Sequence, residues 1–325
     1  MAVLAIEAAY RTGVIDFYSA ETRRYNPDLA QVLRRDQPRI VVVGDSVCAA
    51  AGGWQDLLRA RGVATGVDLI NLSIPGAGFH EYAQRARAWI PRLKPRLVLI
   101  GAYVGNDLWN AYSPYPDRSA LRGVYYALSS HLQFLKWVNS RAAHLPVIGQ
   151  LILGPEPPAV VAKDASHLGW TPGYLTEYAR DYPLMVTDGI TLPASSAEQL
   201  ARIDALMGQI AETARAAGAR VVLVIFPSSA QVDRRYYPGF YQRLGFVADP
   251  ALLVGCDRVQ QELGARARRH GMEVLDPLSE MRASPENLYY LDNDHPSPAG
   301  HAWLCDWLAR QAPIRELAVR GRAGG

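Results

Sequence analysis

Cysteine is scarce in this chain of 325 residues. Cys48, Cys256 and Cys305 are few, odd in number and far apart, so they match neither a disulfide framework nor a zinc site. This usage is compatible with a reducing compartment and leaves an oxidising one open. No group of His, Asp and Glu residues has metal-ligand spacing either. We therefore expect no metal and no cofactor.

Lysine is also rare, because nearly all the basic residues of the chain are arginines. The chain has 34 Lys and Arg residues against 31 Asp and Glu, a net charge of +3, and only Lys94, Lys136 and Lys163 are lysines. The basic residues are dispersed, and pairs such as Arg23-Arg24 are too short to form a nucleic-acid-binding stripe. We expect no nucleic-acid partner.

Long hydrophobic runs are also missing. No segment approaches the roughly 18 to 20 apolar residues that span a bilayer, and the apolar start at residues 1–6 is interrupted by Glu7. Two localisations stay open. The protein is expected to be cytoplasmic if Met1 is the native start, and membrane-anchored or extracytoplasmic if a segment upstream has been removed. Nothing in the sequence indicates the oligomeric state.

Five short apolar runs alternate with helical patterns along the chain. Hydrophobic residues make up 49% of the sequence, enough for a full core. The runs read as buried parallel strands because they are rich in branched residues and bounded by Gly or polar residues; they lie at 39–44, 67–72, 96–101, 220–226 and 272–276. Helical spacing between them predicts an α/β fold, a three-layer doubly wound parallel sheet in a single domain over residues 1–325.

Residues 110–194 break this alternation. The segment contains Pro- and Gly-rich stretches and a helical stripe of apolar residues between Leu121 and Val138. It is too long for an ordinary crossover, so we expect an insertion that caps the carboxyl edge of the sheet. Packing on the domain explains its apolar stripe better than an acyl-chain groove does. At its end, Ser195 and Glu198 form a predicted capping box, and Gly218 is expected to end the helix that follows.

Ser46 follows the strongest predicted strand, in the run Gly44-Asp45-Ser46. A serine at that junction lies near a helix N-terminus, where free N–H groups and the helix dipole stabilise a developing oxyanion. The pattern is not Gly-x-Ser-x-Gly, because Cys48 occupies the last position. By itself the motif fits helix capping at least as well as catalysis.

Asp292 and His295 lie near the other end of the chain. A spacing of three lets one turn present both side chains, so that the carboxylate can hold Nδ1–H while Nε2 faces a hydroxyl. The structural alternative is a loop that caps a helix beginning near Pro298. Taken alone, the pair favours that alternative.

Two further segments follow predicted strands at the same edge of the sheet. The first runs from Asn71 to Gly78 and contains Gly76; the second runs from Tyr103 to Asp107 and contains Asn106. A glycine lets its backbone N–H approach a substrate oxygen, and an asparagine side chain supplies a neutral donor. Such donors, aimed at a tetrahedral oxyanion, each contribute roughly 3 to 4 kcal/mol.

These four segments, in this order, resemble the blocks of the SGNH (GDSL-type) hydrolases, which have a flavodoxin-like sheet. The resemblance implies that Ser46 is the nucleophile, His295 the general base and Asp292 the residue that orients it. It also implies an oxyanion hole made by the N–H of Ser46, the N–H of Gly76 and the side chain of Asn106. The chain departs from the family pattern at Val47 and Val104, and Gly78 is a competitor for Gly76.

Several other residues near these segments have structural readings beside functional ones. Asp294 is a weaker candidate for the acid that orients His295, and Asp276 is expected to cap a turn. We expect His301 to pack on the last helix. His80 fits either a pocket wall or a surface loop, and residues 227–231 fit either a substrate contact or a simple turn.

The resemblance implies a serine esterase that hydrolyses a carboxylic ester, O-acetyl or another acyl, through a Ser46 acyl-enzyme. Its expected partner is a small-molecule or glycan acyl ester. The alternative is an acyltransferase that uses the same site to move the acyl group onto a glycan or natural-product alcohol. A binding module without catalysis is disfavoured, because such a module need not retain all five site residues.

Overall fold

The computed structural model describes residues 2–12, 14–61, 66–105, 107, 132, 134, 137–138, 194–242 and 250–323. The predicted insertion at 110–194 lies almost wholly outside these residues. Its role as a cap therefore stays a prediction, as does the assignment of the whole chain to one domain.

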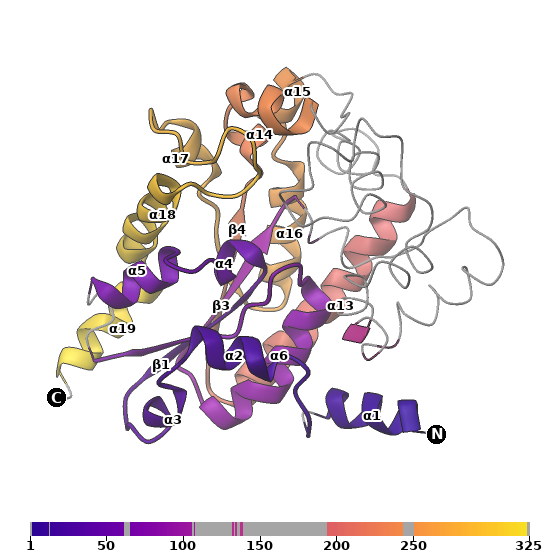
Figure 1. Cartoon of the computed structure of the whole chain (residues 1–325), viewed down its shortest axis with the longest axis vertical. Coiled ribbons are helices and arrows are strands. Elements are labelled where there is room, and N and C mark those ends of the chain that lie inside the picture. Colours follow the sequence, from indigo (N-terminus) through magenta and orange to yellow (C-terminus); the bar gives the residue numbers. More distant parts are fainter. Residues whose placement is uncertain are drawn as a thin grey trace.

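A parallel sheet of five strands forms the centre of the described structure (Figure 1). The strands are β1 (Arg39–Gly44), β2 (Asp68–Asn71), β3 (Leu97–Tyr103), β4 (Arg220–Phe226) and β5 (Glu273–Leu275). Their order is β2-β1-β3-β4-β5, and every pairing is parallel. This is the doubly wound order with a switch point between β1 and β3. The predicted fold class and the five predicted strands are confirmed.

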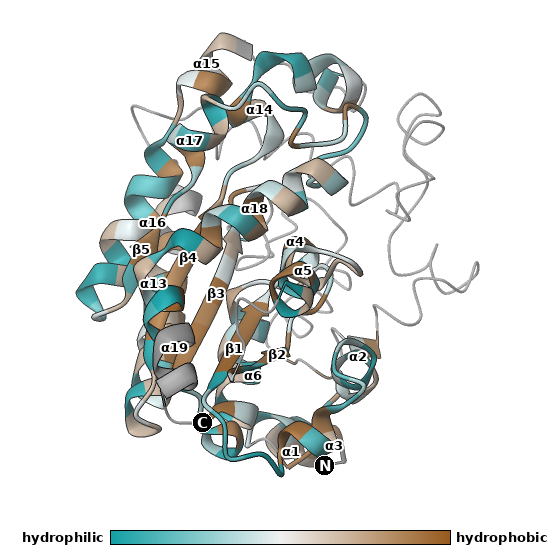
Figure 2. Ribbon diagram, turned by 90° about the vertical axis from the view of Figure 1, so that its left-hand side faces the viewer, coloured by the Kyte–Doolittle hydropathy of each residue, from teal (hydrophilic) through white to brown (hydrophobic). Residues whose placement is uncertain are grey.

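Helices cover both faces of the sheet, which makes three layers (Figures 1 and 2). One face carries α6 (Phe79–Leu93), α13 (Ala194–Ala216) and α16 (Arg258–Arg269). The other carries α4 (Ser46–Ala49), α5 (Trp54–Ala60), α18 (Pro298–Arg310) and α19 (Ala312–Ala323). In Figure 2 the strands are largely brown, and the helices around them carry teal stretches.

Alternate residues of β1 enter the two hydrophobic cores. Val41 and Val43 pack into the core under α6 and α13, whereas Ile40 and Val42 pack into the core under α5 and α18. Successive strand side chains point to opposite faces, so a strand covered on both sides must be apolar throughout. Burial on both faces therefore explains the continuous apolar run from which this strand was predicted.

Shorter helices complete the described structure. They are α1 (Ala2–Arg11), α2 (Ser19–Tyr25), α3 (Leu29–Val32), α14 (Ser229–Val232), the 3₁₀ helix η2 (Arg234–Tyr236), the π-helix η3 (Tyr237–Gln242), α15 (Pro250–Gly255) and α17 (Leu278–Arg282). In the part of the chain that the structure describes, no helix has the length and apolar character to cross a membrane.

Gly218 ends α13, as predicted. Its φ of 72° lies in the left-handed region, which glycine adopts without a steric penalty. The turn lets the N–H of Ala219 donate to the carbonyl of Ala214 at 2.9 Å, which satisfies one carbonyl of the last helical turn. The chain then enters β4 directly.

Candidate active site

Ser46 is the first residue of α4 and lies directly beyond the carboxyl end of β1. Asp45, not Ser46, caps this helix: its carboxylate accepts a hydrogen bond from the N–H of Val47 at 2.9 Å. The capping role that competed with catalysis therefore falls to the neighbouring residue. The half-buried Ser46 side chain is left for another partner.

That partner is His295, which is 249 residues away in the sequence. Ser46 Oγ and His295 Nε2 are 2.9 Å apart, a hydrogen-bond distance for a nucleophile and its base. Burial lowers the pKa of His295 from its usual 6.5, so the ring is neutral at pH 7. A neutral imidazole can accept the serine proton.

Two glycines let α4 approach the sheet closely. Gly44 ends β1 and pairs with Gly101 of β3. A Cβ on Gly44 would lie 2.6 Å from the sulfur of Cys48, and one on Gly101 would lie 2.2 Å from it. The fully buried Cys48 therefore packs on both strands, and this contact seats the helix that carries Ser46.

His295 lies in a loop that is fixed at both ends. The N–H of Tyr290 donates to the His295 carbonyl at 3.1 Å, and Tyr289 forms an isolated bridge with Pro296. Ser297 then caps α18, because its hydroxyl accepts from the N–H of Gly300 at 3.1 Å. The capped helix beginning at Pro298, predicted as the alternative to catalysis, is present next to the contact between His295 and Ser46.

Asp294 ties this loop to the carboxyl edge of the sheet. Its carboxylate accepts from the N–H of Ser229 at 2.9 Å, from the Ser229 hydroxyl at 2.6 Å and from the hydroxyl of Tyr103. Tyr103 ends β3 and Ser229 begins α14, just beyond β4. Burial raises the pKa of Asp294 above its usual range. These contacts make Asp294 an anchor of the His295 loop.

The structure does not bring Asp292 to His295. The Asp292 side chain is exposed and makes no hydrogen bond to any described residue. Asn293 takes that place instead: its Oδ1 lies 2.6 Å from His295 Nδ1. The role of Asp292 stays a prediction. Nothing in a single sequence distinguished Asn293 from an ordinary loop residue.

The predicted oxyanion donors are described in part. Gly76 occupies an exposed turn after β2 with a φ of 72°. Gly78 donates its N–H to the carboxylate of Glu81 at 3.0 Å, so the N–H of this alternative to Gly76 already has a hydrogen-bond acceptor.

Asn106 lies outside the described residues. Its neighbour Asp107 is buried and accepts from the hydroxyl of Tyr82 and the N–H of Tyr103. The oxyanion hole stays a prediction.

Asp45, which precedes Ser46, and Asp107 are both fully buried acids. Burial raises the pKa of Asp45 from 3.8 to about 7, against the opposing hydrogen bonds from the Val47 and Ser46 backbone. Burial and the charge of Asp45 raise the pKa of Asp107 as well. Ionising both Asp45 and Asp107 therefore raises the free energy of the folded protein.

We expect Asp45→Asn to flatten the dependence of stability on pH. The pKa of Asp45 is about 7 in the folded state and near 3.8 when unfolded, so only the folded state holds the proton between these values. The wild-type free energy of unfolding should thus fall as pH rises through this window, on the order of 4 kcal/mol in all. Urea unfolding at about pH 4 and about pH 8 measures it. An equal pH dependence in Asp45→Asn and wild type would contradict the assignment, and the exposed Asp36→Asn is the control.

Gly239 lets the π-helix η3 contact the His295 loop. A Cβ at this position would lie 1.8 Å from the carbonyl oxygen of Leu291 and 2.8 Å from its carbon. The backbone leading to Asp292 would have to move. π-Helices are frequently found at functional sites.

We expect Gly239→Ala to lower kcat by roughly 10- to 100-fold, because small displacements of a catalytic group cost about that much. Steady-state ester hydrolysis together with thermal unfolding measures the effect. The control is Gly255→Ala, since nothing lies within 4 Å of a Cβ at that glycine. Unchanged kcat in Gly239→Ala would show that the loop tolerates the shift.

Among the other candidates, Asp276 and Ser229 make structural contacts. Asp276 accepts from the N–H of Leu278 at 3.0 Å, as a turn cap does. His301 is 8% exposed on α18, and burial together with His295 lowers its pKa to about 4. His80 is half-buried near the start of α6. The segment 227–231 holds Asp294 through Ser229.

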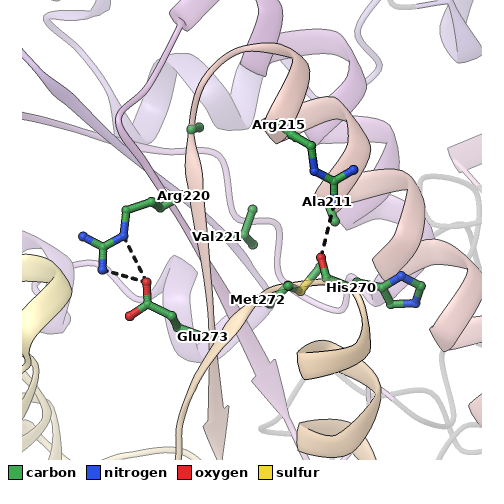
Figure 3. Close-up of a pocket in the computed structure, with 9 residues that line it drawn as sticks. Ala211, Arg215, Arg220, Val221, His270, Met272 and Glu273 are labelled. Atoms are coloured by element: carbon green, nitrogen blue, oxygen red, sulfur yellow. Dashed lines mark hydrogen bonds and ion pairs between the residues drawn. The ribbon is translucent and has the colours of Figure 1, made fainter.

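A pocket at the opposite edge of the sheet does not contain this chemistry. It is lined by residues at the starts of β4 and β5, including Arg220 and Glu273, whose side chains pair at 2.7 Å (Figure 3). Arg215 also donates to the His270 carbonyl there. Ser46 follows the carboxyl end of β1, so this pocket is not its substrate site. Among the described residues, no three His, Cys, Asp or Glu side chains gather as a metal site.

Comparison with known proteins adds an independent line of support. The GDSL-like lipase/acylhydrolase family matches residues 42–303, which include Ser46 and His295. No curated protein sequence showed a significant match.

Among solved structures, the chain is similar to a putative acylhydrolase from Bacteroides fragilis NCTC 9343, with 14% identity, 90% of this chain and 95% of that chain covered, and a TM-score of 0.44. It is also similar to a lipase/acylhydrolase from Enterococcus faecalis (18% identity, 87% and 97% covered, TM-score 0.41). A third similar structure is a catalytic mutant of the acetylxylan esterase Axe2 from Geobacillus stearothermophilus, with 14% identity, 84% of this chain and 93% of that chain covered, and a TM-score of 0.45. The family match spans most of the chain, and the chain therefore belongs to the GDSL-like lipase/acylhydrolase family and is an ester-hydrolysing enzyme.

Proposed function

We propose that this enzyme hydrolyses a carboxylic ester, O-acetyl or another acyl, through an acyl-enzyme on Ser46. Ser46 Oγ attacks the ester carbonyl while His295 Nε2 takes its proton. The tetrahedral intermediate then collapses, and the proton passes from His295 to the leaving alcohol. In the second half, His295 takes a proton from water, whose oxygen attacks the acyl-enzyme. Collapse releases the acid and returns the proton to Ser46.

The observation that carries this proposal is the contact of 2.9 Å between Ser46 Oγ and His295 Nε2. It joins the ends of two segments 249 residues apart at one edge of the sheet. The lowered pKa of His295 adds to it, because only the neutral ring can act as the base.

The proposed oxyanion hole consists of the N–H of Ser46, the N–H of Gly76 and the side chain of Asn106. Ser46 begins a helix, where first-turn N–H groups lack intrahelical partners. Gly76 follows β2 and Asn106 follows β3, the two neighbours of β1. These positions support a shared location at the carboxyl edge.

The acyltransferase alternative uses the same acyl-enzyme and differs in the final acceptor, an alcohol of a glycan or natural product in place of water. No contact among the described residues favours that acceptor. We therefore propose hydrolysis as the principal reaction.

Labelling with a fluorophosphonate tests the proposal. We expect one probe per chain, with the modified peptide containing Ser46, and hydrolysis of p-nitrophenyl esters that the probe abolishes. Varying the acyl chain and adding alcohol acceptors then reports acyl preference and transfer. Labelling at another residue, or hydrolysis that survives full labelling, would overturn the assignment of Ser46.

A further inference from the structure

β2 is an edge strand of the described sheet, and a side chain pairs with the edge that faces away from β1. Asn26, the C-cap residue of α2, binds both backbone groups of Asn71, the last residue of β2. Its Oδ1 accepts from the Asn71 N–H at 2.8 Å, and its Nδ2 donates to the Asn71 carbonyl at 2.6 Å. Both residues are buried, so without Asn26 the two backbone groups would lose their partners away from water.

The side chain of Asn71 extends this contact to the helix that begins with Ser46. Its Nδ2 donates to the carbonyl of Cys48 in α4 at 2.8 Å, and its Oδ1 accepts from the N–H of Ser73 at 3.0 Å. Cys48 lies two residues after Ser46, and Ser73 lies on the way to Gly76. Asn71 therefore joins the segment that carries the proposed nucleophile to the segment that leads to a proposed oxyanion donor.

A second contact from the same N-terminal part of the chain holds the next residue. Arg85 of α6 is buried, and its Nε donates to the carbonyl of Leu72 at 3.1 Å. Its guanidinium also binds the carboxylate of Asp16 at 2.6 and 2.7 Å and the hydroxyl of Thr22. Residues 16–26 thus brace the segment after β2 at two successive positions. They precede the residues that the family match covers.

We infer that Asn26 is a positioning residue of the ester-hydrolysing site, an inference that rests on the proposed function. In that function the oxyanion hole takes one N–H from Ser46 and one from Gly76. Asn26 acts through Asn71, whose side chain spans the two segments. Donors stabilise an oxyanion best when they are held in place before the reaction, and a small displacement lowers the rate steeply.

The competing role is structural alone, because covering the edge of β2 stabilises the fold whatever the spacing of the two segments. Two other N-terminal residues separate these roles. Val32 of α3 is buried in the core and its side chain cannot hydrogen-bond, and Arg35 pairs with Asp68 at the other end of β2 at 2.9 Å. Val32→Ala and Arg35→Gln therefore loosen the same part of the chain without removing a contact to Asn71.

The experiment measures kcat and KM for p-nitrophenyl acetate, and the Ki of phenylboronic acid, in the wild type, two Asn26 variants and the two controls. The boronic acid forms a tetrahedral adduct on a serine nucleophile and so reports on the oxyanion donors. We expect Asn26→Ala to lower kcat by roughly 10- to 100-fold and to raise Ki by a similar factor, with KM little changed. Asn26→Asp keeps the acceptor for the Asn71 N–H but lacks the NH₂ group that reaches the carbonyl, so it should change both constants in the same direction.

Thermal unfolding gives the folded fraction of each variant. Val32→Ala should lower the unfolding temperature, while kcat and Ki of its folded fraction should equal those of the wild type, and Arg35→Gln should match the wild type in both constants. A wild-type kcat in folded Asn26→Ala, a lowered kcat with unchanged Ki, or an equal loss of kcat in Val32→Ala would overturn the inference. Failure of both Asn26 variants to fold would also overturn it, because the role of Asn26 would then be structural.

Ser46→Ala distinguishes failure of this inference from failure of the proposed function. If Ser46→Ala keeps wild-type turnover, the proposed function is wrong. If Ser46→Ala is inactive while folded Asn26→Ala turns over like the wild type, the proposed function stands and only the role of Asn26 is wrong.

Discussion

Replacing Ser46 with alanine should lower kcat for ester hydrolysis by roughly 10⁴- to 10⁶-fold, the loss seen when a serine nucleophile is removed. Without Oγ no acyl-enzyme can form, and His295 Nε2 loses the hydroxyl that lies 2.9 Å from it. The proposed oxyanion donors remain in this variant, so KM should change little. Steady-state kinetics on p-nitrophenyl esters and labelling by a fluorophosphonate measure the two consequences.

Stability should be nearly unaffected by this change. Asp45 supplies the cap of α4, so Ser46→Ala removes no capping contact from the helix. The control is Ser279→Ala, because Ser279 is exposed on α17 and its hydroxyl binds Glu280. If Ser46→Ala kept even a tenth of wild-type turnover, the covalent mechanism at this residue would have to be abandoned.

Replacing His295 with alanine has the second largest expected effect, a loss of roughly 10⁴- to 10⁶-fold in kcat near neutral pH. The change removes Nε2, the ring nitrogen 2.9 Å from Ser46 Oγ that is proposed to take its proton. His270→Ala is the matched control, since that histidine pairs with Asp204 at 3.1 Å beside the pocket at the opposite edge of the sheet. It should leave kcat unchanged.

The wild-type pH profile should carry the signature of this base. Burial lowers the pKa of His295 below 6.5, and the protonated ring cannot accept the Ser46 proton. Thus kcat/KM should fall as the pH drops through a midpoint below 6.5. The titration of His295 should leave kcat/KM constant through neutral pH. His301, whose pKa is about 4, stays neutral across that range. A midpoint above 6.5 would mean that a carboxylate, not burial, dominates the surroundings of His295.

The sequence by itself determined the fold class, and it placed Ser46, the proposed nucleophile, directly after a predicted strand. Each strand was visible as a run of branched residues, because burial on both faces requires every side chain to be apolar. Ser46 could be singled out because it directly follows such a run. The end of α13 could be predicted because residue 218 is a glycine, which adopts the observed positive φ without a steric penalty. All of these signals are local, since they depend on residues a few positions apart.

The tertiary structure alone decided what each residue of the His295 loop contacts. Asp292, Asn293 and Asp294 are consecutive polar residues, and their spacing offered a carboxylate for His295 at position 292. In the folded chain the amide of Asn293 reaches the ring, while Asp294 turns to Ser229 and Tyr103. Side-chain direction in a loop is set by partners far away in sequence, such as Gly239 against Leu291. No local periodicity encodes such contacts. They depend on the sheet, which places the carboxyl ends of its strands side by side, and so they could be identified only in the tertiary structure.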